Sequence, residues 1–226
     1  MLERRRQTTM KTKLFAIAIL AGAVSAANAA VLWDNNVIPN GVNGRAISPP
    51  AFPNIRVVDD IDVGGPGWIV NTLRAFIIDD TAWSSGNTID VYVYNDASGV
   101  PGGLHANWAG LSFTKTAGAS YFGRPGFTYN INVGGMNLAP GRYWIGMRNP
   151  NASGSGTNYW MTSDGGPDGA SSSTGYFSLD GGTTWGPEGS GWHHAFVIEG
   201  NPVPEPATML AIGAGLAALA ARRRRK

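Results

Sequence analysis

The sequence predicts an all-β fold, and three features of the chain support this prediction. Short segments rich in Val, Ile, Tyr and Trp alternate with clusters of Gly, Asn, Asp and Pro. No long segment repeats its apolar residues at the helical period. Glycine accounts for 32 of the 226 residues. We therefore expect a two-sheet antiparallel sandwich, jelly-roll-like, flanked by an N-terminal signal peptide and a short C-terminal membrane helix.

Nine segments are predicted to be strands, because turn-forming residues bound each of them. They are residues 55–63, 68–78, 88–94, 111–115, 127–133, 142–148, 159–162, 176–179 and 192–199. Within the third segment, Ile89, Val91 and Val93 alternate with Asp and Tyr, so one face should be buried. Residues 95–103 are predicted to form a polar loop, and residues 149–175 to form long surface loops around one strand.

The predicted module, residues 30–200, has no cysteine, so neither a disulfide nor a thiolate metal site stabilises it. Ten of the 17 Lys and Arg residues lie in the two tails. Residues 30–202 contain seven basic and thirteen acidic residues, a net charge of −6. Such a charge repels phosphate backbones, so nucleic-acid binding is not expected. We find no repeat of fixed period and expect one module.

Residues 1–29 are predicted to be a signal peptide. A basic stretch precedes the apolar run 14–24, and small residues ending in Ala27 and Ala29 follow it. Cleavage is predicted after Ala29, and the protein should then leave the cytoplasm through the inner membrane.

The start of translation stays open between Met1 and Met10, because the residues after Met10 alone make an ordinary basic region. The adjacent Arg5 and Arg6 leave the twin-arginine route as an alternative, although the residues that follow them do not favour it.

The tail, residues 201–226, has three parts in succession. Its first part is an alternating proline motif that favours an extended, accessible backbone, namely Val203, Pro204, Glu205 and Pro206. Residues 207–221 are apolar apart from one threonine, and residues 222–226 are all Arg or Lys. As a helix the apolar part is about 22 Å long, against a hydrocarbon core of about 30 Å. Composition alone therefore also fits a plain C-terminal anchor with a cytoplasmic basic end.

The order and spacing of these three parts resemble the PEP-CTERM sorting signal of Gram-negative bacteria. The family's motif residues correspond here to Pro204, Glu205 and Pro206. The resemblance implies recognition by exosortase, a multipass membrane protease or transpeptidase. It further implies transient membrane anchoring, removal of the tail, and delivery to the cell surface or the exopolysaccharide matrix. The same tail is attached to many unrelated domains, so it leaves the module undefined.

The module itself is loosely similar to sandwich modules of other PEP-CTERM proteins. The similar segments are Asp59 with Asp60, Trp68, residues 94–103, residues 140–144 and residues 196–200.

No sequence motif of catalysis is found, neither a nucleophile elbow nor a zinc-protease, P-loop or dinucleotide-binding pattern. The adjacent His193 and His194 should point to opposite faces of a strand, which disfavours a shared metal. We expect a non-catalytic surface or matrix protein without a cofactor, associated with exopolysaccharide or biofilm. The alternatives are a secreted glycoside-acting hydrolase, whose paired carboxylates leave no trace in sequence spacing, and a protein-binding adhesin.

Residues 178–185 fit the Asp-box pattern of sialidases and other secreted β proteins. In this pattern Asp180 should accept hydrogen bonds across a tight turn, Gly181 and Gly182 should adopt positive φ, and Trp185 should pack beneath the hairpin. We expect a structural role for this hairpin.

Five aspartates near predicted strand ends offer oxygen ligands for Ca²⁺, although solvated turn residues are the favoured interpretation. They are Asp59, Asp60, Asp62, Asp79 and Asp80.

All eight Trp and all seven Tyr residues lie between residues 31 and 200. Strand alternation places Tyr92, Tyr94 and Trp144 on the face opposite the main core. Exposed there, these rings would form an aromatic patch that stacks on sugars. Burial under the long loops, or against a strand assigned wrongly from the pattern, is the favoured interpretation.

Overall fold

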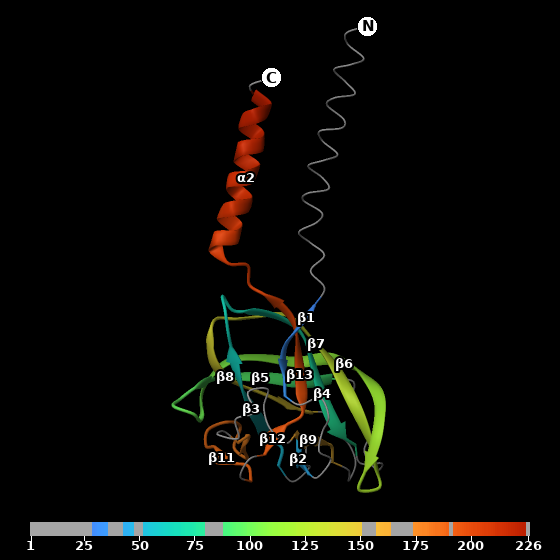
Figure 1. Ribbon diagram of the computed structural model, residues 1–226. Coiled ribbons are helices and arrows are strands. Elements are labelled where there is room, and N and C mark those ends of the chain that lie inside the picture. The colour runs from blue at the N-terminus through green and yellow to red at the C-terminus, as the bar shows by residue number, and fades with distance from the viewer. Residues whose placement is uncertain are drawn as a thin grey trace. The chain divides into compact units, whose positions relative to one another are not determined.

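The computed structural model describes residues 29–35, 43–47, 52–79, 88–150, 157–163, 174–189 and 192–224 (Figure 1). The predicted signal peptide, including Ala27, lies outside these residues, which contain only Ala29 of it. The described chain is mostly β, as the sequence predicted, and its strands form a large antiparallel sheet.

Thirteen strands belong to the sheet within the described part of the chain. They are β1 (Ala30–Asp34), β2 (Gly44–Ala46), β3 (Arg56–Val63), β4 (Trp68–Ile78), β5 (Thr88–Asp96), β6 (Pro101–Tyr121), β7 (Arg124–Leu138), β8 (Gly141–Arg148), β9 (Tyr159–Ser163), β10 (Tyr176–Ser178), β11 (Gly186–Pro187), β12 (His193–His194) and β13 (Phe196–Pro202).

Strand β6 joins the two halves of this sheet. Its residues 101–112 pair with β5, and its residues 113–121 pair with β7. The neighbours run β1-β13-β4-β7-β6-β5-β8-β3-β10-β11, and β9 pairs with β2, β4 and β12 beside this path. Because the pairing continues through β6, it does not test the two-sheet, jelly-roll-like arrangement, which stays a prediction.

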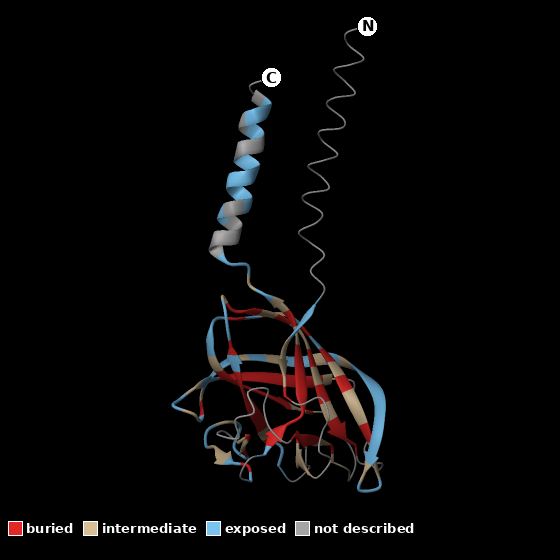
Figure 2. Cartoon of the chain, viewed as in Figure 1, coloured by how far each residue is buried: buried red, intermediate tan, exposed pale blue. Residues whose placement is uncertain are grey.

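The main core consists mainly of buried apolar residues from these strands, and Figure 2 marks all buried residues in red. Ile89, Val91 and Val93 of β5 are fully buried in it, as the alternation predicted. Phe196 and Ile198 of β13 reach the same core. Burying such side chains contributes about 1.5–3 kcal/mol each. The last strand in sequence therefore packs into the main core.

The turn between β6 and β7 consists of Phe122 and Gly123. Their φ angles are 54° and 73°, the pattern of a type I′ turn, which suits the twist of a hairpin. Glycine and asparagine adopt such angles at low cost, whereas a bulky aromatic residue rarely does. Phe122 is 69% exposed, so core packing does not explain its presence there.

Three features of the sheet correct the predicted strands. Strand β6 is far longer than residues 111–115, and the predicted loop 95–103 is reduced to residues 97–100. Strands β1, β2 and β11 were not predicted. Long Gly- and Ala-containing stretches of β6 lack apolar alternation, and pairing with β5 and β7 holds them extended instead.

Helix α2 (Pro206–Arg224) begins at a proline, which is favoured in the first turn. Its apolar part is limited to residues 207–221, rich in Ala and Gly, and arginines complete its last turn. Among the described residues, no helix has the length and apolarity that crossing a membrane requires. The short membrane helix expected from the sequence stays a prediction.

Candidate functional site

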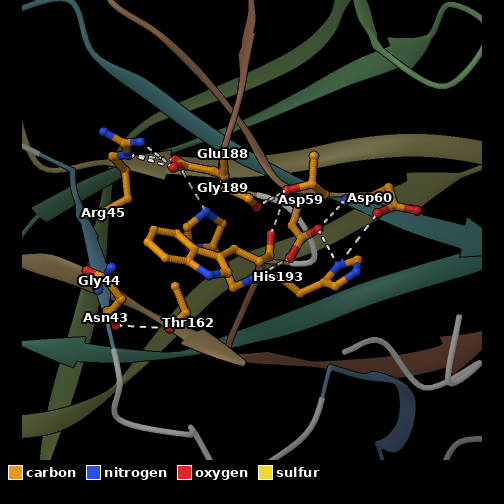
Figure 3. A network of polar contacts seen from close by, with 12 residues as sticks. Asn43, Gly44, Arg45, Asp59, Asp60, Thr162, Glu188, Gly189 and His193 are labelled. Carbon is orange, nitrogen blue, oxygen red and sulfur yellow. Dashed lines mark hydrogen bonds and ion pairs between the residues drawn. The ribbon is translucent and has the colours of Figure 1, made fainter. Parts of the chain in front are cut away.

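A buried polar network surrounds Asp59 of β3 (Figure 3). Its Oδ1 lies 3.0 Å from Nδ1 of His193 and accepts the backbone N–H of Asp60 at 3.0 Å. Its Oδ2 accepts hydrogen bonds from Nδ2 of Asn35 at 3.0 Å and from the backbone N–H of His194 at 2.5 Å. One carboxylate therefore connects β3 with β12 and with the residue that follows β1.

Burial raises the pKa of Asp59 to about 6, since removing a carboxylate from water disfavours its charged form. The hydrogen bond and the charge of His193 act in the opposite direction. The carboxylate of Asp59 is the acceptor for several buried donors, and removing it would leave these donors unsatisfied at a cost in stability.

Asp60 continues the network toward solvent. Its Oδ2 accepts a hydrogen bond from Nη2 of Arg142 at 2.5 Å, and its Oδ1 lies 3.9 Å from Nδ1 of His193. Nε of the same arginine lies 3.5 Å from Oδ1 of Asp62, which is exposed. Arg142 therefore balances two of the three clustered aspartates.

Ligand atoms of Asp59, Asp60 and His193 lie within 4.8 Å of one another, close enough to surround a cation. The oxygens of Asp59 already face four hydrogen-bond contacts, and Asp60 faces a guanidinium. Calcium takes about six to eight oxygen ligands, which this group does not offer. The contacts fit a hydrogen-bonded network better than a metal centre.

Among the described residues, the structure does not bring Asp79 together with Asp59, Asp60 and Asp62. Asp79 instead accepts hydrogen bonds from Nζ of Lys115 at 2.6 Å and from Oη of Tyr129 at 2.7 Å. Asp62 is exposed on β3, and Asp80 lies outside the described residues.

A second ion pair, between the partly exposed Arg45 and the buried Glu188, lies beside the first network. Glu188 accepts hydrogen bonds from Nε and Nη2 of Arg45, and its side chain is almost fully buried. Burial raises the pKa of Glu188, while Arg45 lowers it. Nε2 of His194 lies 3.9 Å from Oε1 of Glu188. Figure 3 shows Arg45 and Glu188 facing each other across this region.

His194 packs on Trp160, with 4.6 Å between ring centroids and 21° between ring planes. Burial lowers the pKa of His194 to about 3, so the imidazole is neutral at pH 7. The ring of His193 contacts Asp59, whereas the ring of His194 packs on Trp160. These different contacts agree with the predicted opposite orientation of the two side chains. Sequence reasoning missed Arg45 and Glu188, since they are separated by 143 residues and carry no motif.

The three candidate sugar-stacking residues are buried, which confirms the favoured interpretation and contradicts an exposed aromatic patch. Tyr92, Tyr94 and Trp144 form a second small cluster, separate from the main core. Trp185 packs edge-on against Tyr94 at 4.9 Å, and Tyr176 against Trp144 at 5.1 Å. The sequence correctly placed these three side chains on the face opposite the main core, and residues 176–185 cover that face.

The covering segment is the Asp-box hairpin, whose predicted geometry is confirmed. Asp180 accepts hydrogen bonds from the backbone N–H groups of Thr183 and Thr184 at 3.0 and 2.9 Å, and from Oγ1 of Thr184 at 2.7 Å. Gly181 and Gly182 have φ angles of 82° and 95°. These hydrogen bonds hold the pKa of Asp180 below its usual range.

The proline motif lies directly between the sheet and α2. The last sheet pair is Pro202 with Trp68, and the backbone N–H of Val203 donates to the carbonyl of Gly67 at 2.9 Å. Pro204 and Glu205 are exposed and lie in neither strand nor helix. The backbone of these residues is therefore accessible to a processing enzyme without disruption of the sheet's hydrogen bonds.

Comparison with known families identifies this tail. The PEP-CTERM protein-sorting motif matches residues 202–225, which confirms the resemblance of the three-part tail. The chain carries the sorting signal of proteins that exosortase processes during export to the cell surface. A search of curated proteins found no significant match to the chain.

Proposed function

We propose that this protein is an exported, non-catalytic component of the cell surface or extracellular matrix, sorted by exosortase and associated with exopolysaccharide in biofilm. The observation that carries the proposal is the PEP-CTERM match at residues 202–225. Its position supports this function, because the motif begins where the last strand ends.

The tail supports a transient stage at the inner membrane. The arginines that end α2 are attracted to anionic lipid headgroups, while the exposed Glu205 precedes the helix. Exosortase would then remove the tail and release the module to the surface.

The module supports a binding or structural role rather than catalysis. The buried carboxylates of Asp59 and Glu188 are engaged by hydrogen-bond partners within the fold. General acid–base catalysis requires such groups to reach a substrate. A two-layer, jelly-roll-like sandwich fits the bent strand β6, which serves both halves of the sheet.

The sorting step is tested by Glu205→Ala and Pro206→Ala in the producing cells. Each variant should leave a heavier, unprocessed band in the inner-membrane fraction, because the enzyme's recognition motif is lost. Glu199→Ala is the matched control: this acid lies on β13, 2.9 Å from Arg74, and its loss should leave processing unchanged. Normal processing and surface delivery of both motif variants would contradict the exosortase assignment.

Matrix association is tested by retention of the exported protein on the organism's exopolysaccharide and on its proteinaceous matrix. Retention on the polysaccharide supports the proposal. Retention on protein alone would indicate an adhesin, and release of reducing sugar would indicate a hydrolase.

A further inference from the structure

A partly open hollow of about 170 Å³ lies where β4, β6 and β7 meet. Its walls include Phe76, Tyr121 and Phe127, all of which are partly exposed. A cavity of about 150 Å³ in another protein holds one benzene molecule. The hollow is therefore large enough for a single six-membered ring, and three aromatic side chains line it.

The hollow exists because β6 loses its register with β7 at this point. The pairing shifts between Ala117 and Ser120, where Gly118 and Ala119 of β6 face the single residue Gly126 of β7, so β6 has one extra residue in a bulge. Gly126 faces this bulge: a Cβ there would lie 2.2 Å from the carbonyl oxygen of Ala119 and 3.0 Å from Cε of Met161. Only glycine permits this close approach, and the backbone itself therefore shapes the hollow.

The β6–β7 hairpin is locally basic. Residues 101–138 contain Lys115 and Arg124 and no Asp or Glu, in a module whose net charge is −6, and Lys115 pairs with Asp79. Arg124 pairs directly with Tyr121 in the hairpin, and its guanidinium lies 5.3 Å from the ring centre of Tyr159. Tyr159 and Tyr121 pack in one cluster with Met161, so Arg124 lies beside the hollow.

The hairpin tip adds a further aromatic ring. Phe122 follows Tyr121, is 69% exposed, and has a φ of 54°. A bulky residue in this conformation costs free energy that asparagine or glycine would avoid. Strand β6 is largely exposed along this part (Figure 2). Retaining an exposed ring at a strained turn is typical of a binding surface.

We propose that the end of the β6–β7 hairpin binds one sugar ring of an acidic polysaccharide. The ring packs in the hollow against Tyr121 and Phe127, the carboxylate of the sugar pairs with Arg124, and Phe122 contacts the continuing chain. Aromatic faces bind the C–H faces of pyranose rings, and a guanidinium binds carboxylates by charge-assisted hydrogen bonds. This inference rests on the proposed association with exopolysaccharide and names its ligand class and site.

The test is calorimetric titration of the exported protein with oligomannuronate, oligogalacturonate and oligoglucuronate, and with a neutral cello-oligosaccharide of equal length. At least one acidic oligosaccharide should bind more tightly than the neutral one. Tyr121→Ala should weaken that binding about tenfold through lost stacking. Arg124→Gln should remove the preference for the acidic sugar.

Phe122→Asn separates binding from folding. Asn-Gly is the favoured type I′ sequence, so this variant should melt at or above the temperature of the parent and still bind about tenfold more weakly. Leu104→Ala is the matched control, an exposed apolar residue on the half of β6 that pairs with β5. Its binding should equal that of the parent.

Three results would overturn the site: no binding of any acidic oligosaccharide, equal binding of the neutral one, or parental affinity in folded Tyr121→Ala and Phe122→Asn. Correct tail processing together with any of these results would reject this site and leave the sorting function standing.

Discussion

Asp59 and His194 are neighbours in the buried network, and their pKa values move in opposite directions. The pKa of Asp59 is about 6 in the folded state, against an ordinary value of 3.8. Between about pH 4 and 6 the folded state therefore binds more protons than the unfolded state, and the free energy of unfolding falls as the pH rises through this range. His194 has a folded pKa of about 3 against 6.5, so stability falls as pH drops below 6.5. The two contributions offset each other between about pH 4 and 6.

Asp59→Asn should remove this compensation. At pH 7 we expect a loss of about 3 kcal/mol in the free energy of unfolding, because an amide cannot accept all the donors that Asn35, His193 and His194 aim at the carboxylate. As the pH falls from 6.5 to 4, the variant should lose stability more steeply than the parent, since the His194 contribution is no longer offset.

Urea denaturation at pH values from 4 to 7 measures both effects. The control is Asp62→Asn, an exposed aspartate of the same strand near the same Arg142. It should follow the parental pH profile. A parental slope in the Asp59→Asn protein would show that this carboxylate does not titrate within the folded state.

Local motifs and long-range contacts differ in how far the sequence predicts them. The sorting motif was predicted in full, because its recognition depends on a contiguous stretch of backbone. Arg45 and Glu188 were not, because only the folded sheet brings them together. Tyr92 was placed on the correct face, but nothing in its own strand indicates that a later hairpin covers it.

At the scale of secondary structure, the same distinction holds. Strand β4 was predicted with its observed bounds, since its apolar residues alternate and turn residues flank it. Strand β6 was predicted at a quarter of its length, because β5 and β7 on either side impose its extended backbone. Short edge strands such as β11 have too few residues for any pattern.

The Asp-box hairpin acts as a cover over the second aromatic cluster, and Asp180→Ala should loosen it. Without the carboxylate, the backbone N–H groups of Thr183 and Thr184 lose their acceptor. Hydrogen exchange at these two amides should accelerate about tenfold or more, while exchange in β4 stays at the parental rate. Acrylamide should also quench tryptophan fluorescence more strongly, because Trp185 no longer packs steadily on Tyr94.

Leu179→Ala is the control within the same hairpin, since its side chain is exposed. It should leave the exchange of Thr183 and Thr184 unchanged. Unchanged exchange in Asp180→Ala as well would mean that the glycine turn alone maintains the hairpin.

At the scale of the whole molecule, folding and sorting use adjacent but separate segments. The sheet ends at Pro202, its last backbone hydrogen bond comes from Val203, and the exposed motif follows. Removal of the tail within the motif should therefore leave every strand pair intact.

Truncated chains test this separation. A chain ending at Glu205 should unfold at the same temperature as the full chain, because α2 contributes no strand to the sheet. A chain ending at Gly200 should lose about 1–3 kcal/mol in the free energy of unfolding, because it lacks the last sheet pairs and the Val203 hydrogen bond.

A chain ending at Ala195 lacks β13 and should show no cooperative unfolding. The three fully buried side chains removed from β13, Phe196, Val197 and Ile198, contribute about 1.5–3 kcal/mol each, comparable together with the whole stability of a domain. Circular dichroism melting curves distinguish the three chains, and a lower melting temperature for the chain ending at Glu205 would show that the tail supports the fold it exports.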